Sequence, residues 1–380
     1  MRPGPSVRAV GSIADIDPSD WDALVPDNAM CSHGWLRTVE ETCDVALRPT
    51  YFVIEEARRL RAATWCYRLP ATKTVLTIDD LMFGRARGVA NALGLTFLPA
   101  VLCRPMAGYE GHVLVHPAVD AASAASMGRA LVDALEALAS SDGTGLAFSC
   151  LTDRQAGLLD LLAERGYRRT LQFPVSYLDV RWDSFSGYLE HVKSRSRGTA
   201  GSIRSEINRA RKAEVVVERL HDPAPSEARL IDLASGQMRR TAGRPFPFRA
   251  GFFTSLARNL GEGAHVYAAF KEGSLTGFSL MLERGGVAHV PFIGLDPGRS
   301  KQDPSYFLLA YDRPIMDAIA QGFSRVHFGE ALYEFKRRRG CSTFGTWCCY
   351  RASSPARHLL VGRWFAFHSL WMKLKLRQAR

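Results

Sequence analysis

Seven basic residues stand close together between positions 193 and 212, where the only acid is Glu206. The guanidinium groups of Arg195, Arg197 and Arg204 in this cluster can pair bidentately with phosphate oxygens. We therefore take these three arginines as candidate substrate-binding residues. The alternative is a solvated basic face of a helix.

A second basic region covers the C-terminal end, because the chain has no Asp or Glu after Glu334. The net charge of +11 comes largely from this region. Clustered positive charge favours anionic partners such as phosphates, nucleic acid or a membrane surface. Residues 363–380 also carry many apolar and aromatic side chains, which we expect to dock on the protein rather than on a membrane.

Motifs of the common hydrolases and nucleotide-binding enzymes are missing from the sequence. It has no GxSxG, HExxH or GxxxxGK[ST], and no GxGxxG followed by an acid in a suitable βαβ unit. Eight cysteines are scattered, and the cluster of Cys341, Cys348 and Cys349 lacks paired CxxC spacing, so we expect no metal site. The sequence therefore gives no support to Ser-His-Asp hydrolysis, zinc hydrolysis or P-loop chemistry.

Length and composition indicate a folded protein with two domains. The chain has 380 residues, 47% of them hydrophobic and 23% charged, which suits two domains of roughly 150 to 200 residues. The N-terminus lacks the apolar stretch of a signal peptide, and no segment is apolar enough to span a bilayer. We therefore expect a cytoplasmic protein with reduced cysteines.

The first half of the sequence predicts a mixture of helices and strands. Residues 122–140 are rich in strong helix formers and end before a Ser-Asp-Gly breaker. Thr152 or Asp153 is the expected N-cap of a later helix that stops at Gly166. The remaining predicted elements are a helix over 35–43 and strands over 51–55, 61–68, 145–151 and 171–180.

The second half repeats this order in outline. We predict a basic, mostly helical segment over 183–212, a strand at VVVERL, a hairpin of 264–270 with 275–283, and strands over 287–294 and 325–329. Between the last two strands a helix over 304–321, with Asp303 as N-cap and Pro304 at its first position, should be kinked by Pro314. We place the domains at 1–180 and 181–380, the second ending in a C-terminal helix.

Three segments together resemble the FemAB-like branch of the GNAT superfamily of acyltransferases. Residues 322–340 (GFSRVHFGEALYEFKRRRG) contain Phe328, Gly329, Glu330, Lys336 and Gly340 at positions similar to the family's. DSFSGYLEHVKSRSR is similar to the segment that opens the second domain, although Gly198–Gly201 should interrupt its basic helix. SHGWLRTVEE looks like the N-terminal helix. The resemblance implies an α/β (α+β) fold of tandem GNAT-like domains, each with a mixed, mostly antiparallel sheet flanked by helices.

The resemblance also implies roles for individual residues. Lys336 matches a lysine that lies beside the acyl carbonyl, where an ammonium stabilises negative charge in the transition state. Glu330 is expected to accept a proton or to orient Lys336, so these two are the candidate catalytic residues. His289 and Tyr306 should lie near the open end of the sheet, which makes them candidates for substrate binding.

Together these features predict an acyl- or aminoacyl-transferase that forms an amide on an amine-bearing acceptor, in natural-product or cell-wall biosynthesis. The donor would be acyl-CoA or aminoacyl-tRNA, without a metal, and the acceptor a small molecule or a peptide. The alternative is a binding or scaffold subunit that works beside a partner enzyme in a tailoring or cyclisation step and has no acyl transfer of its own.

Overall fold

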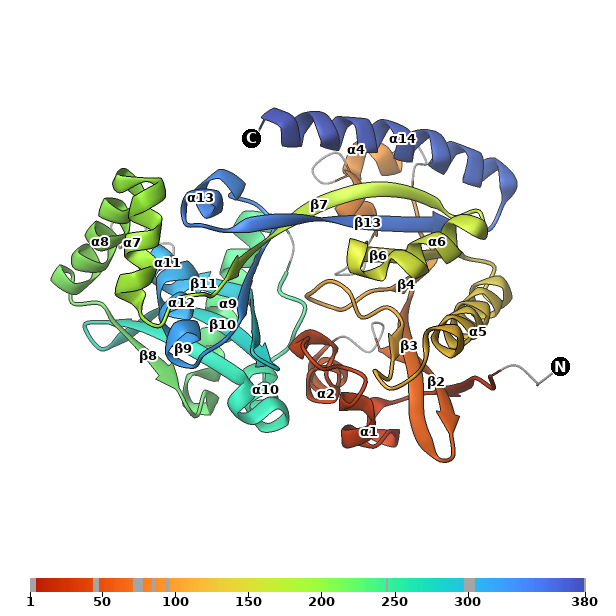
Figure 1. Ribbon diagram of the computed structural model, residues 1–380, viewed down its shortest axis with the longest axis horizontal. Coiled ribbons are helices and arrows are strands. Elements are labelled where there is room, and N and C mark those ends of the chain that lie inside the picture. Colours follow the sequence, from red (N-terminus) through yellow and green to blue (C-terminus); the bar gives the residue numbers. More distant parts are fainter. Residues whose placement is uncertain are drawn as a thin grey trace. The chain divides into compact units, whose positions relative to one another are not determined.

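The computed structural model describes residues 5–43, 48–70, 78–83, 87–92, 96–243, 245–296 and 305–378 (Figure 1). It divides into two compact units. Unit 1 consists of Met1–Pro26, Met30–Pro174 and Gly345–Arg380, and unit 2 of Asp27–Ala29 and Val175–Phe344. Our predicted boundary near residue 180 separates two copies of one fold, which is a different division from units 1 and 2. It stays a prediction.

The sheet of unit 1 is mixed, with strands in the order β1-β2-β3-β4-β6-β13 and β5 beside β3. The neighbours are antiparallel except β4 and β6, which run parallel from the pair Ala100 and Gly145 to the pair Cys103 and Phe148. The predicted hairpin of β2 and β3 is confirmed. The strands are β1 (Arg8–Val10), β2 (Pro49–Glu56), β3 (Arg59–Leu69), β4 (Ala100–Cys103), β5 (Leu114–Val115), β6 (Gly145–Leu151) and β13 (Ser342–Arg351).

Helix α5 (Ala121–Ser141) covers one face of this sheet, as its apolar spacing predicts. Asp120 caps it by accepting hydrogen bonds from the amides of Ala122 and Ser123, and Leu131 and Leu135 are buried in the core against β-strand residues. The predicted helix after β6 is present as α6 (Ala156–Glu164), preceded by a 3₁₀ turn that Thr152 caps. The other helices of unit 1 are α1 (Pro18–Asp22), α2 (His33–Thr42), α3 (Ile78–Phe83), α4 (Arg87–Ala92) and α14 (Pro355–Gln378), with 3₁₀ turns η1 (Ile13–Asp15), η2 (Ala29–Cys31, shared with unit 2) and η5 (Asp153–Gln155).

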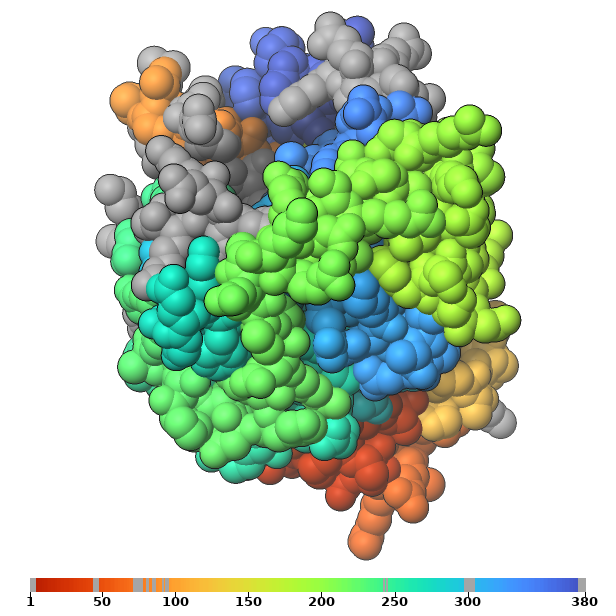
Figure 2. Space-filling view, turned by 90° about the vertical axis from the view of Figure 1, so that its left-hand side faces the viewer, coloured from red at the N-terminus to blue at the C-terminus, as the bar shows by residue number. Residues whose placement is uncertain are grey.

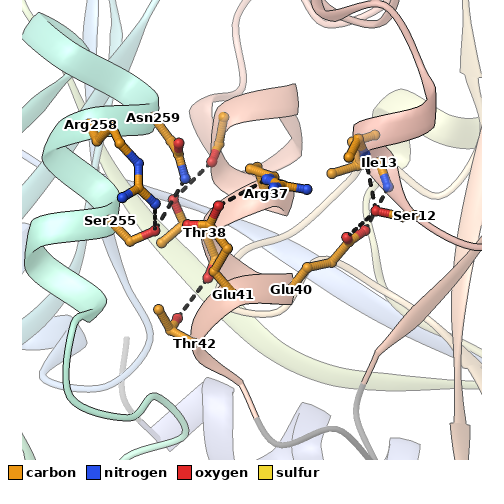
Figure 3. A network of polar contacts seen from close by, with 12 residues as sticks. Ser12, Ile13, Arg37, Thr38, Glu40, Glu41, Thr42, Ser255, Arg258 and Asn259 are labelled. Carbon is orange, nitrogen blue, oxygen red and sulfur yellow. Dashed lines mark hydrogen bonds and ion pairs between the residues drawn. The ribbon is translucent and has the colours of Figure 1, made fainter.

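A carboxylate on α2 fixes the N-terminal segment of unit 1. Glu40 accepts hydrogen bonds from the Ser12 hydroxyl at 2.6 Å and from the Ile13 amide at 2.7 Å (Figure 3). The Tyr51 hydroxyl on β2 donates to the same carboxylate at 2.7 Å. One side chain therefore ties the N-terminal segment, the predicted N-terminal helix and the sheet together.

The sheet of unit 2 has the order β7-β12-β11-β10-β9-β8 and is antiparallel except for one pair. The predicted hairpin of β9 and β10 is confirmed, and the exception is β11 beside β12. This arrangement is the mixed, mostly antiparallel sheet that we predicted. Its strands are β7 (Arg168–Asp179), β8 (Val216–Leu220), β9 (Ala264–Lys271), β10 (Ser274–Arg284), β11 (Val287–Leu295) and β12 (Arg325–Gly329).

The basic segment forms two helices, α7 (Phe185–Arg195) and α8 (Arg197–Lys212), which meet at Ser196. Our expectation that Gly198–Gly201 interrupts the basic helix is wrong, because α8 runs through these residues and the break lies at Ser196 instead. Ser196 ends α7 and also caps α8 through its hydroxyl, which accepts from the Thr199 amide. Figure 2 faces this side of unit 2, where a blue surface from the later part of the chain borders the green surface of the basic segment.

Helix α9 (Glu227–Ala242) packs on β11, with α10 (Phe252–Leu260) beside it. Gly294 on β11 permits the close approach, since a Cβ at this position would lie 2.8 Å from the backbone of Leu233 on α9. Nothing in the sequence led us to predict these two helices. Unit 2 also contains α13 (Tyr333–Arg338) and the 3₁₀ turns η6 (Ala224–Ser226) and η7 (Gly261–Gly263).

The predicted kinked helix consists of three pieces. They are α11 (Ser305–Phe307), the π-helical turn η8 (Leu308–Asp312) and α12 (Arg313–Ala320). Pro314 lies in the first turn of α12, where a missing amide hydrogen is tolerated. The π turn ends at Asp312, directly before α12 begins. The expected N-cap Asp303 and Pro304 lie outside the described residues.

Each sheet is completed by a strand from the other half of the sequence. In unit 1, residues Trp347–Arg351 of β13 pair with β6. In unit 2, residues Ser176–Asp179 of β7 pair with β12. The chain therefore passes from one unit to the other twice within strands.

Candidate functional site

The two parallel strands of unit 2 separate before they end. Their pairing covers Val287 to His289 on β11 and Arg325 to His327 on β12. Strand β11 nevertheless continues to Leu295, paired with β10 on its other side. Among the described residues, the pairing of β11 with β12 thus does not continue beyond His289.

Two stacked histidines mark the point of separation. His289 and His327 are a registered pair, both buried, with ring centroids 4.6 Å apart and planes 7° apart. Tyr177 on β7 and Phe344 lie against His327, with ring centroids at 6.0 and 5.8 Å. Burial lowers the pKa of His289 to about 4, so this imidazole is neutral at neutral pH.

A strained turn follows β12. Gly329, Ala331 and Leu332 have φ angles of 69°, 65° and 51°, and this left-handed conformation is unfavourable for alanine and leucine. The turn leads into α13, where the amide of Lys336 donates to the carbonyl of Leu332 at 3.0 Å. Such strain persists only where surrounding contacts hold it in place.

Lys336 supplies those contacts. Its side chain is buried, and Nζ donates to the carbonyls of Phe328 at 2.8 Å, Gly329 at 3.1 Å and Glu330 at 2.7 Å. Burial lowers the pKa of Lys336 to about 8, although Cys341 and Glu330 oppose the shift. Because an ammonium has three hydrogens, these carbonyls use its full donor capacity.

The two candidate catalytic residues are therefore close together. Glu330 presents its carbonyl to Lys336, and its side chain is exposed in the turn. Tyr306 belongs to the same region, because it contacts Tyr311, whose ring centroid lies 5.2 Å from that of Phe335 beside Lys336. Burial raises the pKa of Tyr306, so its phenol is protonated at neutral pH.

The candidate phosphate-binding arginines lie elsewhere in unit 2, on α7 and α8. Arg195 ends α7 and Arg197 begins α8, so they flank the cap residue Ser196, and both are exposed. Arg204 is also exposed but pairs with Glu190 at 3.1 Å. Of the three arginines, only Arg197 lies in the first turn of a helix, where the helix dipole favours anions, whereas Arg195 lies in the last turn of α7.

A buried ion pair that we did not predict connects α8 with the residue after α13. The guanidinium of Arg339 pairs with the carboxylate of Glu206, and their side chains are 2% and 7% exposed. Arg339 also lies over the ring of Phe335, 3.9 Å from its centroid. Burial raises the pKa of Glu206 even beside this arginine. The sequence signal was present, since Glu206 is the only acid in the basic cluster.

Asp312 is a second charged residue that we did not single out. It ends the π-helical turn, its side chain is fully buried, and neither carboxylate oxygen has a hydrogen-bond partner among the described residues. Burial raises its pKa to about 7, with Arg339 opposing and Glu206 adding to the shift. An acid directly after the apolar run of residues 307–311 (FLLAY) was the available signal.

In the part of the chain that the structure describes, no group of three His, Cys, Asp or Glu side chains is placed to hold a metal ion. Likewise, no helix of the described ranges is long and apolar enough to cross a bilayer.

Comparison with solved structures shows the class of fold. The chain is similar to FemX (12% identity, TM-score 0.58, covering 93% of this chain and 99% of that one) and to L-PGS from Bacillus licheniformis (13%, 0.55, 92% and 97%). It is also similar to a tandem GNAT protein from the clavulanic acid biosynthesis pathway (13%, 0.50, 92% and 99%). The predicted GNAT-like α/β fold is confirmed.

The family follows from the sequence itself. A family model described as peptidoglycan biosynthesis/recognition matches residues 12–379, and the chain belongs to this FemAB-like family. The resemblance that we drew from three segments is thereby confirmed. No curated protein matches the sequence significantly.

Proposed function

We propose that this protein is a transferase that forms an amide by moving an acyl or aminoacyl group to an amine-bearing acceptor. The observation that carries the proposal is the separation of β11 and β12 at His289 and His327, next to the turn that Lys336 holds. Family membership supports it, because the family is described by peptidoglycan biosynthesis or recognition. The acceptor is a small molecule or a peptide.

The donor is acyl-CoA or aminoacyl-tRNA. Its acyl group would lie along the unpaired side of β11 beyond His289, where backbone amides and carbonyls can pair with it. Both donors carry phosphates, for which Arg195 and Arg197 are the proposed partners. Arg204 contributes to the same basic surface but is partly neutralised by Glu190.

In the reaction, the acceptor nitrogen attacks the donor's carbonyl carbon, and the thioester or ester bond to the leaving group breaks. Glu330 takes the proton that the amine loses, and Lys336 favours the negative charge that develops on the carbonyl oxygen. To do so, Nζ of Lys336 must either give up one of its three hydrogen bonds to backbone carbonyls and donate to the substrate oxygen, or keep all three and stabilise the charge electrostatically from a distance. His289 and Tyr306 are the proposed walls of the acceptor site.

One observation favours a second candidate function. The three backbone carbonyls that Lys336 contacts leave its ammonium no spare donor. A lysine that only shapes the turn suits a binding or scaffold subunit that assists a partner enzyme without acyl transfer of its own.

Two measurements on the purified chain separate the candidates. Binding of acetyl-CoA and of aminoacyl-tRNA is measured at increasing salt; contact with several tRNA phosphates should weaken steeply, and contact with one CoA modestly. Each donor is then incubated with mixed amine acceptors and the products are followed by mass spectrometry. A new amide supports the transferase, whereas no donor binding at low salt contradicts it. Donor-independent co-purification of a second enzyme favours the scaffold.

A further inference from the structure

Helix α14 has two different faces. One face is fixed to unit 1 by the buried side chains of Val361, Phe365, His368 and Met372. The ring of Phe365 lies 5.6 Å from that of Phe97, and the Leu171 amide donates to the Ser369 hydroxyl at 3.1 Å. The docking that we expected for this segment is present on this face.

The opposite face is apolar and exposed to solvent. Nine large apolar side chains of the described residues are exposed, and six of them belong to α14. Leu360, Phe367, Trp371 and Leu374 follow helical spacing and are 56%, 61%, 47% and 50% exposed. Leu359 and Leu370 widen the stripe. Such a concentration on one helix marks an interaction surface rather than scattered surface residues.

The charges around this stripe are of one sign. Arg363 lies within it and Lys373 beside it, and both are exposed. The sequence adds Lys375, Arg377 and Arg380 and contains no acid after Glu334. A cationic helix with an exposed aromatic and aliphatic stripe is complementary to a surface that is apolar below and anionic at the top.

These observations decide among the possible occupants of the face. A second copy of the chain, packed α14 against α14, would bring two sets of cations together without an acid to neutralise them, which opposes association. No described helix can span a bilayer, so insertion across the membrane does not explain the apolar stripe. An anionic lipid surface satisfies both the stripe and the cations.

We infer that α14 attaches the protein to the surface of a membrane that contains anionic phospholipid. The helix lies along the surface, with Leu360, Phe367, Trp371 and Leu374 in the boundary between head groups and acyl chains and Arg363 and Lys373 on lipid phosphates. The buried face holds unit 1 against the helix at the same time. This inference goes beyond the proposed function and does not depend on it.

Co-sedimentation of the full chain with lipid vesicles tests the inference. One set of vesicles contains phosphatidylcholine alone, and the other also contains phosphatidylglycerol at about a third of the lipid. The wild-type protein should pellet with the anionic vesicles about tenfold more than with the neutral ones, and added salt should reduce the difference. Protein that stays in the supernatant with both lipids overturns the inference.

Matched variants locate the contact. The pair Phe367→Ser and Trp371→Ser should abolish pelleting, while Val216→Ser, at an exposed apolar residue on β8, should leave it unchanged. The pair Arg363→Glu and Lys373→Glu should also abolish it, whereas Arg211→Glu with Lys212→Glu on α8 should not. Circular dichroism checks that each variant is folded.

Two results contradict the assignment to α14. Equal loss in the α8 control would mean a general attraction of a basic protein. A wild-type dimer that Phe367→Ser with Trp371→Ser converts to a monomer, without vesicle binding, would mean that a second copy covers this face. Light scattering on the same samples distinguishes these cases.

Discussion

The imidazole of His289 stacks on that of His327, with centroids 4.6 Å apart, where the parallel strands β11 and β12 separate. Burial lowers the pKa of His289 to about 4 from 6.5. Because the pKa is lower in the folded than in the unfolded chain, the neutral imidazole's contribution to the free energy of unfolding is fully present above the unfolded-state pKa. This contribution is lost as the pH falls toward 4.

His289→Phe keeps an aromatic ring but removes this titration. The loss of unfolding free energy between about pH 7 and pH 4.5 should therefore shrink by as much as about 3 kcal/mol. Urea unfolding at the two pH values measures it, with His221→Phe at an exposed site as control. An unchanged pH dependence in His289→Phe would show that this ring is not the source.

Lys336→Met should lower both stability and rate. Three backbone carbonyls, one buried and two partly buried, lose their charged donor, which should cost about 3 kcal/mol of unfolding free energy. Turnover should fall about a hundredfold if the ammonium also serves the transition state. The control Arg337→Met changes an exposed pair with Glu334 and should alter stability by less than about 1 kcal/mol.

The variant Lys336→Arg separates the two roles of this residue. If it recovers stability without recovering turnover, the ammonium acts on the substrate. If turnover and stability recover together, Lys336 acts through the turn.

Glu206→Gln should destabilise unit 2 by about 3 kcal/mol, because Arg339 would remain buried without its counter-charge. Denaturant unfolding measures the loss. Glu334→Gln, which changes an exposed pair, is the control. The double variant Glu206→Met with Arg339→Met should be more stable than Glu206→Met alone, and a less stable double variant would contradict the interpretation of an uncompensated charge.

Asp312→Asn should flatten the dependence of stability on pH between about 4 and 7. The pKa of Asp312 is raised to about 7 from 3.8, so its contribution is fully present below the unfolded pKa and is lost as the pH rises through 7. At pH 8 the free energy of unfolding of the variant should therefore exceed that of the wild type by up to about 4 kcal/mol. Asp317→Asn on α12 is the control; parallel curves for wild type and Asp312→Asn would refute the assignment.

Arg197→Ala should weaken donor binding more than Arg204→Ala, because Arg204 already pairs with Glu190 whereas Arg197 stands at the start of α8. About a tenfold rise in dissociation constant is expected for the loss of one phosphate contact. Titration with acetyl-CoA and with tRNA measures both variants. Equal effects would mean that the basic surface acts only through its total charge.

Local patterns explain why much of the fold could be predicted. Helix α5 and the hairpins β2–β3 and β9–β10 carry their apolar spacing and turn residues within short stretches. Helix α9 was missed, because its buried side chains are few and Gly236 weakens the pattern. Strand β13 was missed for another reason, since its partner β6 lies about two hundred positions away and no local feature reveals it.

The same distinction applies to the candidate site. Glu330 and Lys336 are six residues apart, so a turn and a short helix were bound to bring them together. Glu206 and Arg339 are 133 positions apart, and only the tertiary fold, which brings α8 to the residue after α13, makes them a pair. Asp312 depends on a π-helical turn, which no spacing rule for ordinary helices predicts.

The exchange of β7 and β13 between the units has a consequence for synthesis on the ribosome. Domains usually fold one after another as the nascent chain emerges. Here the edge of β6 stays unpaired until Arg351 has been translated, although β6 itself ends at Leu151. An unpaired strand edge is a template for association with other chains. The sheet of unit 1 therefore cannot be completed before the whole of unit 2 has been translated, and its open edge must be kept from other chains until then.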